Sequence, residues 1–287
     1  MKKHDRNTKI KCPRMRAFYF SIYILLLLKR MENKMKSNIL RFCKDKKSIS
    51  IFWFIILLPC LDLILVKAQW KLGLNPNLSF VLAGMSAGHI PQILLFWFLP
   101  IYTLILCSDS YIQDVKTGVN NLIISRKGKR AYLLNNFYSS FLIPFLVMFI
   151  ALLINLILAW IVNSNGHESS GLLEMSNPKN ELFSFSQQHP FLINVIFLIN
   201  VSFFTGLAGL LGLSISMIFP DRKYTYPLTF FIWFILVALP NHTITMVMQP
   251  FTEYDYNYVI SSWLFNFIIL FIIAIVAYIY KEKTDEL

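Results

Sequence analysis

The side chains of this chain that could perform catalysis are few and loosely spaced. Residues 212–215, Gly-Leu-Ser-Ile, have the G-x-S-x spacing in which an intramembrane hydrolase can hold a nucleophilic serine. Such a serine needs a base on a later segment to accept its proton, and His242 is the one histidine that follows Ser214. His242 falls at the edge of an apolar segment rather than inside one. The sequence therefore disfavours a hydrolase, for want of a second catalytic group.

Metal, disulfide and nucleotide chemistry are not indicated either. The histidines at 89, 167, 189 and 242 are scattered over polar segments or their edges, without the short spacing of metal ligands. Four cysteines, two in apolar blocks and two among basic residues, have no C-x-x-C pair: Cys12, Cys43, Cys60 and Cys107. No G-x-x-x-x-G-K-[ST] motif is present. We expect neither an enzyme nor a bound cofactor, and any ATP would be bound by another polypeptide.

Asp62 is the one acid well inside a predicted membrane segment. Burying a charged carboxylate in a membrane costs several kcal/mol, so such residues are candidates for a substrate path, and Pro59 could free backbone groups to pair with it. If the first apolar segment ends near residue 61, Asp62 is interfacial instead, and we favour this interpretation. Asn155 and Asn200 could line a path or bond between helices, and the sequence does not separate the two.

Composition places these residues in a membrane protein. The chain is 56 % hydrophobic and only 15 % charged, with 26 phenylalanines among 287 residues. A soluble domain could not bury that much apolar surface. The net charge of +12 is concentrated beside apolar blocks, where bases face anionic lipid rather than nucleic acid.

Six apolar segments are close to the roughly 20 residues that a helix needs to cross a bilayer. They cover residues 48–66, 91–107, 137–162, 190–219, 226–240 and 260–280. The sequence therefore predicts an all-α integral membrane protein with six spans.

The basic residues predict the orientation of these spans. With the N-terminus inside, the outer segments carry only Lys67, Lys71 and Lys179, and the other bases fall on inner segments. By the positive-inside rule, both termini are expected in the cytoplasm (N-in, C-in), in what we expect to be a bacterial plasma membrane.

Residues 1–34 form a basic and apolar leader that does not fit the six-span domain of residues 35–287. Its apolar run at 17–28 is only 12 residues long and is not followed by an A-x-A-like cleavage site. Two interpretations stay open: translation begins at Met31 or Met35, or the leader is a signal-like or interfacial anchor. From Met35 we expect a short helix on the membrane surface before the first span.

A polar stretch at 108–137 separates the second and third predicted spans. We predict an amphipathic helix over 109–124, whose apolar face holds Tyr111, Ile112, Val115, Val119, Leu122 and Ile123. Asp109 and Asp114 fall mainly on the other face, with neighbouring amides and Lys116. Gly118 indicates a break or a close approach. A solvated loop with a membrane-surface helix would explain this pattern equally well.

This stretch resembles the loop between the second and third spans of ABC-2-type permeases, the membrane subunits of a class of ABC transporters. The shared pattern is an acid, a glycine four residues later, an apolar run, a Ser-Arg turn and a tyrosine entering the next span. Here these are Asp114, Gly118, Leu122 to Ile124, Ser125-Arg126 and Tyr132. The chain departs from the pattern at Lys116, often an acid, and at Asn136, often a lysine.

The resemblance implies that this loop is a coupling helix, which seats in a separate cytoplasmic ABC ATPase. Asp114, Gly118, Leu122, Arg126 and Tyr132 would carry the coupling. It also implies a homodimer, or a pair with a related permease, and export of an amphipathic molecule such as an antimicrobial peptide or a drug. The alternative is an ATPase-independent membrane sensor, immunity protein or scaffold.

Small residues also follow one face of the segment 205–216, among them Gly209 and Gly212. Such a face permits close packing of membrane helices, either within one chain or between two subunits.

Overall fold

The structure, a computed structural model, describes residues 38, 41–69, 78–83, 88–162, 185, 188–250 and 256–284, and all regular elements among these residues are helical. The leader at 1–34 and most of the connection 163–189 lie outside the described residues. The elements are α2 (Lys46–Gln69), η1 (Leu78–Val81), α3 (Ile90–Trp97), α4 (Leu99–Thr103), the π-helical turn η2 (Leu104–Ser108), α5 (Asp109–Lys116), α6 (Val119–Lys127), α7 (Lys129–Val162), α10 (Pro190–Ile218), α11 (Arg222–Ala238), η3 (Met246–Met248) and α12 (Tyr256–Lys283).

Four of the described helices, α2, α7, α10 and α12, are long and apolar enough to cross a membrane. The second predicted span is broken into α3 and a continuation from Leu99, which meet at 58° and would form a fifth crossing if they act together. The fifth predicted span corresponds to α11, whose 17 residues extend about 25 Å against a hydrocarbon core of about 30 Å. The all-helical, membrane-type fold is confirmed, whereas the count of six spans stays a prediction.

The break in the second span has a cause in the sequence. Pro100 has no backbone N–H, so the carbonyl of Phe96, four residues earlier, loses its helical donor. The indole nitrogen of the buried Trp233 in α11 donates to that carbonyl at 2.9 Å. This bond replaces the missing backbone bond and attaches α11 to the broken segment.

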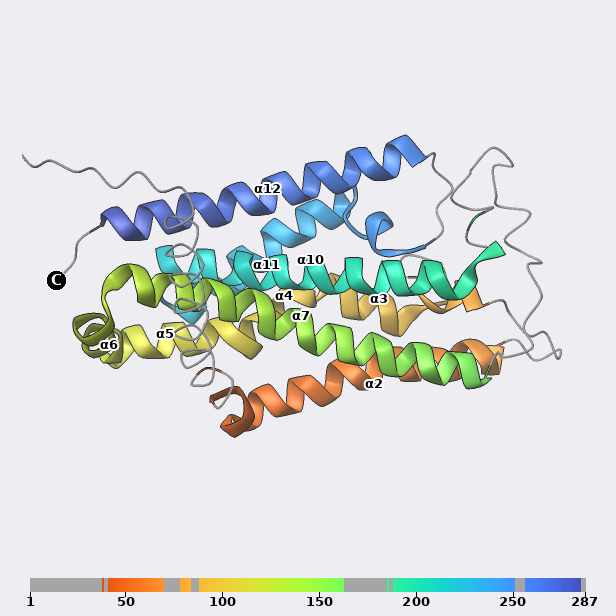
Figure 1. Cartoon of the computed structure of the whole chain (residues 1–287), viewed down its shortest axis with the longest axis horizontal. Helices are drawn as coiled ribbons and strands as arrows, with labels where there is room; N and C mark the ends of the chain where they lie inside the picture. The colour runs from red at the N-terminus through yellow and green to blue at the C-terminus, as the bar shows by residue number, and fades with distance from the viewer. Residues whose placement is uncertain are drawn as a thin grey trace, which may run out of the picture.

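Helix α10 lies at the centre of the bundle. In its most apolar 18-residue window 61 % of the residues are buried, against 22–39 % in the other three membrane-length helices. Figure 1 shows α10 running between α12 and α7, and it contacts both. A Cβ added to Gly209 would lie 2.1 Å from the carbonyl oxygen of Ser140 in α7, and one on Gly212 would lie 2.8 Å from a Leu104 methyl. The contacts of these two glycines are thus made within one chain.

The two ends of the bundle differ in charge. One end, here called the basic end, holds α5, α6, the start of α7, the turn between α10 and α11 and the end of α12 (Figure 1). The first turn of α2 and the segment before it belong to this end, because they bond to η2 and α5. All arginines and lysines that the structure describes lie there, except Lys67 near the last turn of α2. The basic residues, which the sequence predicted to lie on one side of the membrane, therefore gather at one end of the folded bundle.

Candidate functional site

The predicted helix over 109–124 is two helices, α5 and α6, separated by a turn at Gly118. Gly118 has a φ of +72°, and a Cβ added to it would meet nothing within 4 Å. The glycine is therefore required by the left-handed backbone conformation and not by a close approach. The break expected at Gly118 is confirmed, and the close approach, its alternative, is not found.

Helix α5 is fixed to the bundle by its apolar residues. Tyr111 and Ile112 are buried, and the ring of Tyr111 stacks on that of Tyr132 with 6.3 Å between ring centroids. Tyr132 comes from the first turn of α7, and both rings pack with Leu213 and Met217 of α10. Three helices thus meet at the base of the polar stretch.

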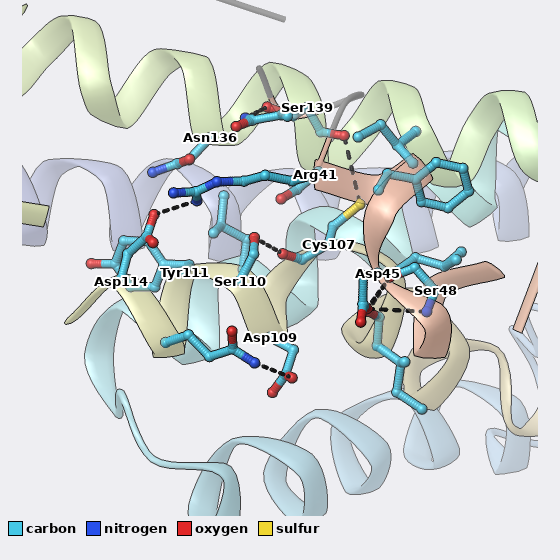
Figure 2. A pocket seen from close by; sticks show the side chains of 18 of the residues that line it. Arg41, Asp45, Ser48, Cys107, Asp109, Ser110, Tyr111, Asp114, Asn136 and Ser139 are labelled. Atoms are coloured by element: carbon cyan, nitrogen blue, oxygen red, sulfur yellow. Dashed lines mark hydrogen bonds and ion pairs between the residues drawn. The ribbon is translucent and has the colours of Figure 1, made fainter. Parts of the chain in front are cut away.

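Two ion pairs fix α5 to the rest of the bundle, and each joins an aspartate of α5 to an arginine of another segment. Asp109 accepts two bonds from Arg222, the first residue of α11, at 2.5 and 2.6 Å. Asp114 accepts from Arg41, before α2, at 2.8 Å (Figure 2). Asp109 and Asp114 are only 8 % and 9 % exposed. They were expected mainly on a polar face, but each is buried because an arginine from another segment neutralises it.

The ion pairs also raise the pKa of the two arginines. The hydrogen bond to Asp114 raises the pKa of Arg41, and the bond to Asp109 raises that of Arg222. A third pair at this end, Lys116 with Asp221 at 3.3 Å, is solvent-exposed on both sides. We therefore expect Lys116 to contribute little to the position of α5.

Helix α6 has no buried residue and lies at the extremity of the basic end (Figure 1). Leu122, expected on the apolar face, is 63 % exposed. Arg126 and Lys127 are exposed in its last turn, and Gly128 separates it from α7. The half-buried Ile123 and Ile124 pack against the Tyr111–Tyr132 cluster. The chain thus presents a short helix whose Leu122 side is exposed, on an anchored base.

The start of α7 is tied to the end of α12. Lys129 donates to the carbonyls of Glu282 and Thr284 at 3.1 and 2.9 Å, and Arg130 pairs with the Glu282 carboxylate at 2.5 Å. Both ends of the α5–α6 segment are therefore fixed: α5 to the segment before α2 and to α11, and the connection after α6 to α12.

A polar cavity of about 630 Å³ opens beside these contacts (Figure 2). Its walls come from the segment before α2, η2, α5 and α7, and include Arg41, Asp45, Asp109, Asp114 and Ser139. A second cavity of about 210 Å³ shares Arg41 and Asp114 with it and extends towards α6 and Tyr132. Sequence reasoning missed both cavities, because four separate segments form them.

Asp45 directly precedes α2 and lines the larger cavity. It accepts bonds from the backbone N–H of Ser48 at 3.1 Å and from the Ser48 hydroxyl at 2.7 Å. Desolvation opposes its ionisation, but these bonds outweigh that effect and lower the pKa of Asp45. Ser48 also lies 3.3 Å from the carbonyl of Ile105, which connects the first turn of α2 to η2.

Asp62 lies in a separate buried cluster towards the other end of the bundle. Its Oδ2 is 2.7 Å from both His89 Nδ1 and Gln92 Nε2, and the residue is 1 % exposed. The interpretation that the first segment ends near residue 61 is wrong, since α2 continues to Gln69. The partners of Asp62 are these two side chains and not backbone groups freed by Pro59. His89 and Gln92 were not predicted as partners of Asp62: His89 was interpreted as a scattered histidine, and Gln92 lies inside the second predicted span.

The two candidate asparagines bond between elements. Asn155 donates to the carbonyl of Pro59 at 2.7 Å, joining α7 to α2. Asn200 donates to the carbonyl of Val247 at 2.6 Å and accepts from the Trp263 indole at 2.8 Å, joining α10 to η3 and α12. Neither they nor Asp62 line the two cavities at the basic end.

Ser214 and His242 are not brought together. The Ser214 hydroxyl donates to the carbonyl of Leu210 at 2.7 Å, near the basic end of α10. His242 follows the opposite end of α11 and lies 3.2 Å from Ser262 of α12. Among the described residues, no group of three or more histidine, cysteine or acidic side chains could hold a metal ion.

Comparison with known proteins gives one relative of high similarity. No family model and no solved structure matches the chain. A protein of Bacillus subtilis (strain 168), described as "Uncharacterized protein YybM", is 40 % identical over 252 residues, which cover 88 % of this chain and all of the relative. The chain belongs to the YybM family. Most of the helical bundle falls within the match.

In this member of the YybM family, the fold gathers only part of the predicted coupling set. Asp114 and Tyr132 both line the smaller cavity beside Arg41. Gly118 forms the turn that follows α5, and Leu122 and Arg126 are exposed on α6. The predicted coupling residues therefore form two groups: Asp114 and Tyr132 are buried, whereas Gly118, Leu122 and Arg126 are exposed.

Proposed function

We propose that this YybM family member is the membrane subunit of an ABC-2-type transporter, and that a separate cytoplasmic ATPase drives it by binding α6. The resemblance of residues 114–132 to the coupling loop of such permeases motivates the proposal. The observation that carries it is the contrast between α5 and α6. Helix α5 has a buried ring and two buried carboxylates, whereas α6 has no buried residue.

An exposed helix on an anchored base is suited to transmit force. A push on α6 would reach α5 through the turn at Gly118. From α5 it would pass to α11 through Asp109–Arg222, to the segment before α2 through Asp114–Arg41, and to α7 through the stacked tyrosines. These contacts join the membrane segments on either side of the loop, so a rigid-body movement of the bundle is the expected response.

The remaining features of the proposal follow from the resemblance and from charge. The basic end would face the cytoplasm of a bacterial cell, in the N-in, C-in orientation with six spans. Two membrane subunits, identical or related, would work with two ATPases. The substrate would be an amphipathic molecule that is exported or expelled, such as an antimicrobial peptide or a drug.

The experiment is co-purification with the ATPase encoded beside this gene, using variants of α6. Leu122→Asp places a charge on a side chain that is already 63 % exposed, so the fold should be retained. We expect the variant to lose ATPase binding and stimulation, because a docked Leu122 would be desolvated and a carboxylate there would lack a partner.

The matched controls are Leu122→Met, which keeps an apolar side chain, and Tyr224→Asp, which adds the same charge at an exposed position on α11. Both should bind the ATPase as the wild type does. If Leu122→Asp still binds and stimulates the ATPase at wild-type level, α6 is not the docking element. If the wild type binds no ATPase, the alternative of an ATPase-independent sensor, immunity protein or scaffold is favoured.

A further inference from the structure

The buried cluster around Asp62 compensates only one oxygen of the carboxylate. Oδ2 lies 2.7 Å from both His89 Nδ1 and Gln92 Nε2, whereas Oδ1 is buried and has no hydrogen-bond partner. An ionised carboxylate spreads its charge over both oxygens, and a buried charge is tolerated only when it is paired and hydrogen-bonded. The bonds that Asp62 accepts are therefore too few to stabilise the carboxylate, and a positive charge is required close to it.

His89 is the side chain of the cluster that can supply this charge. With a neutral imidazole, the cluster carries one net negative charge at a residue that is 1 % exposed. The Gln92 amide is neutral and cannot change that balance. A proton on His89 makes the cluster neutral, as an imidazolium–carboxylate pair. A proton also needs no cavity to hold it.

Other titratable groups lie away from the pair. Helices α3 and α7 pack against α2, and η1 and α10 pack against α7. Within η1, α3 and α10 there is no acidic, basic, cysteine or tyrosine residue, and those of α7 lie between Lys129 and Tyr138, towards the basic end. On α2, Cys60 is half-buried, and Lys67 is exposed in the last turn. Among the described residues, Asp62 is therefore the charged group that faces the His89 ring.

The His89 ring connects Asp62 to the surface. The side chain of His89 is 10 % exposed and that of Asp62 only 2 %. His89 stands just before α3, at the end of the bundle opposite the basic end (Figure 1). Because Nδ1 faces Asp62, a proton from water binds at the other ring nitrogen, Nε2. The lone pair of Nε2 forms the new N–H bond, Nδ1–H continues to donate to Oδ2, and release returns the proton to water.

We propose that Asp62 and His89 form a proton-binding site. His89 takes up one proton from the water at this end of the bundle, and Asp62 stabilises the imidazolium. The imidazole side chain is suited to this role because it gains and loses a proton near neutral pH. An ionisable pair inside a membrane protein is otherwise rare, because burial of either charge alone is unfavourable.

The proton would also hold the junction around Gln92. Gln92 donates to Asp62 and, at 2.6 Å, to the carbonyl of Val81, and it accepts from the N–H of Ala83 at 3.0 Å. The cluster thus joins α2 to residues 81–83 and to α3, the first half of the broken second span. Release of the proton leaves the carboxylate uncompensated, so this junction should be weaker at high pH than at low pH. The site does not depend on an ATPase, and it is tested without one.

The test is a pH titration of the full chain in detergent, with nitrogen-15 in its histidines, followed by nuclear magnetic resonance. The signals of His89 are identified by their absence in His89→Gln. Between about pH 8 and about pH 5, the wild-type His89 ring should change from the neutral form to the imidazolium. Asp62→Asn keeps the size of the side chain and an oxygen acceptor but has no charge. In this variant the imidazolium signal should be lost at the pH at which half of the wild-type rings carry the proton.

Thermal unfolding measures the effect of the proton on the junction. From about pH 5 to about pH 8, the unfolding temperature of the wild type should fall by about 5 °C more than that of Asp62→Asn, because only the wild type loses an ion pair as the pH rises. His189→Gln is the matched control. It removes an exposed histidine at the same end, whose ring lies against Phe185, and it should show the pH dependence of the wild type.

A His89 ring that stays neutral at the lowest pH would overturn the proposal, and so would a ring that keeps its proton at the highest pH, because no proton would be exchanged. The same transition in the wild type and in Asp62→Asn would also overturn it, because the carboxylate would not stabilise the proton. Equal pH dependence of unfolding in these two proteins would contradict the link to the junction. If Asp62→Asn does not fold, the wild-type titration still decides whether a proton binds, and His89→Gln takes the place of Asp62→Asn in the unfolding measurement.

Discussion

The pair between Asp109 and Arg222 should stabilise the basic end measurably, and the two single variants should differ. Arg222→Ala leaves a carboxylate whose side chain is 12 % exposed without its counterion, whereas Asp109→Ala leaves a guanidinium side chain that is 46 % exposed and can be hydrated. We expect losses of about 2–3 kcal/mol for Arg222→Ala and about 1 kcal/mol for Asp109→Ala.

A double-mutant cycle isolates the interaction. The bidentate geometry favours a strong pair, but exposure of the arginine screens it, so a coupling energy of about 1.5 kcal/mol is expected. For a chain of this size, a change of 1 kcal/mol in the free energy of unfolding shifts the unfolding temperature by about 2–4 °C. The expected coupling energy therefore corresponds to about 3–6 °C in thermal unfolding of the detergent-solubilised protein.

The control for this cycle is Lys116→Gln, which breaks the exposed pair with Asp221 and should leave the unfolding temperature unchanged. Additive effects of Asp109→Ala and Arg222→Ala would refute the reasoning, because residues that do not interact show no coupling. An equal loss in both single variants would refute the argument from unequal burial.

Four further predictions concern other parts of the bundle. Gly118→Ala should lower stability by about 1–2 kcal/mol in thermal unfolding because of the positive φ, and Gly118→Asn should be milder. Gly209→Ala should reduce the yield of folded protein, with a loss of about 3 kcal/mol, because its Cβ would lie 2.1 Å from a backbone carbonyl oxygen. Gly206→Ala should lose less, about 2 kcal/mol, because its Cβ would lie 3.0 Å from the nearest backbone carbonyl oxygen and otherwise meets the Phe141 ring. Asp62→Ala should cost about 3 kcal/mol in the same assay, because two buried partners lose their acceptor. A single cysteine at Asn121, in a chain without its native cysteines, should react with an impermeant maleimide only after the membrane is permeabilised.

The membrane helices could be predicted from the sequence because their signal is local. Apolar runs of sufficient length mark α2, α10 and α12 within a few residues of their observed bounds, whereas α7 begins at Lys129, well before the predicted start at residue 137. The broken second span was harder to place. Pro100 lies inside it, but the tertiary bond that compensates for the proline comes from Trp233, more than a hundred residues later.

The polar stretch shows where pattern reasoning fails. Gly118 correctly indicated a break, because glycine is the residue that adopts a positive φ without strain. The faces of the helix were assigned from hydropathy alone, which placed the acids in solvent and Leu122 with the apolar group. Asp109 and Asp114 are buried instead, because arginines that are distant in sequence pair with them. No local pattern contains that information.

The buried cluster at Asp62 could be predicted only in part. The sequence singled out the carboxylate from its place in an apolar run. It could not supply His89 and Gln92, since they lie at the start of α3 and no local pattern tells which face of that helix packs against α2. The cavities at the basic end were missed for the same reason: each is an assembly of short pieces from several segments.

The central claim is that α6 is the binding site of a separate ATPase, and cross-linking at residue 122 in living cells tests it most directly. A photoreactive amino acid at this position should form an adduct with a protein that contains a G-x-x-x-x-G-K-[ST] motif, and the adduct should disappear when the same amino acid replaces Tyr224 on α11. Adducts at residue 122 that contain no such ATPase would contradict the account.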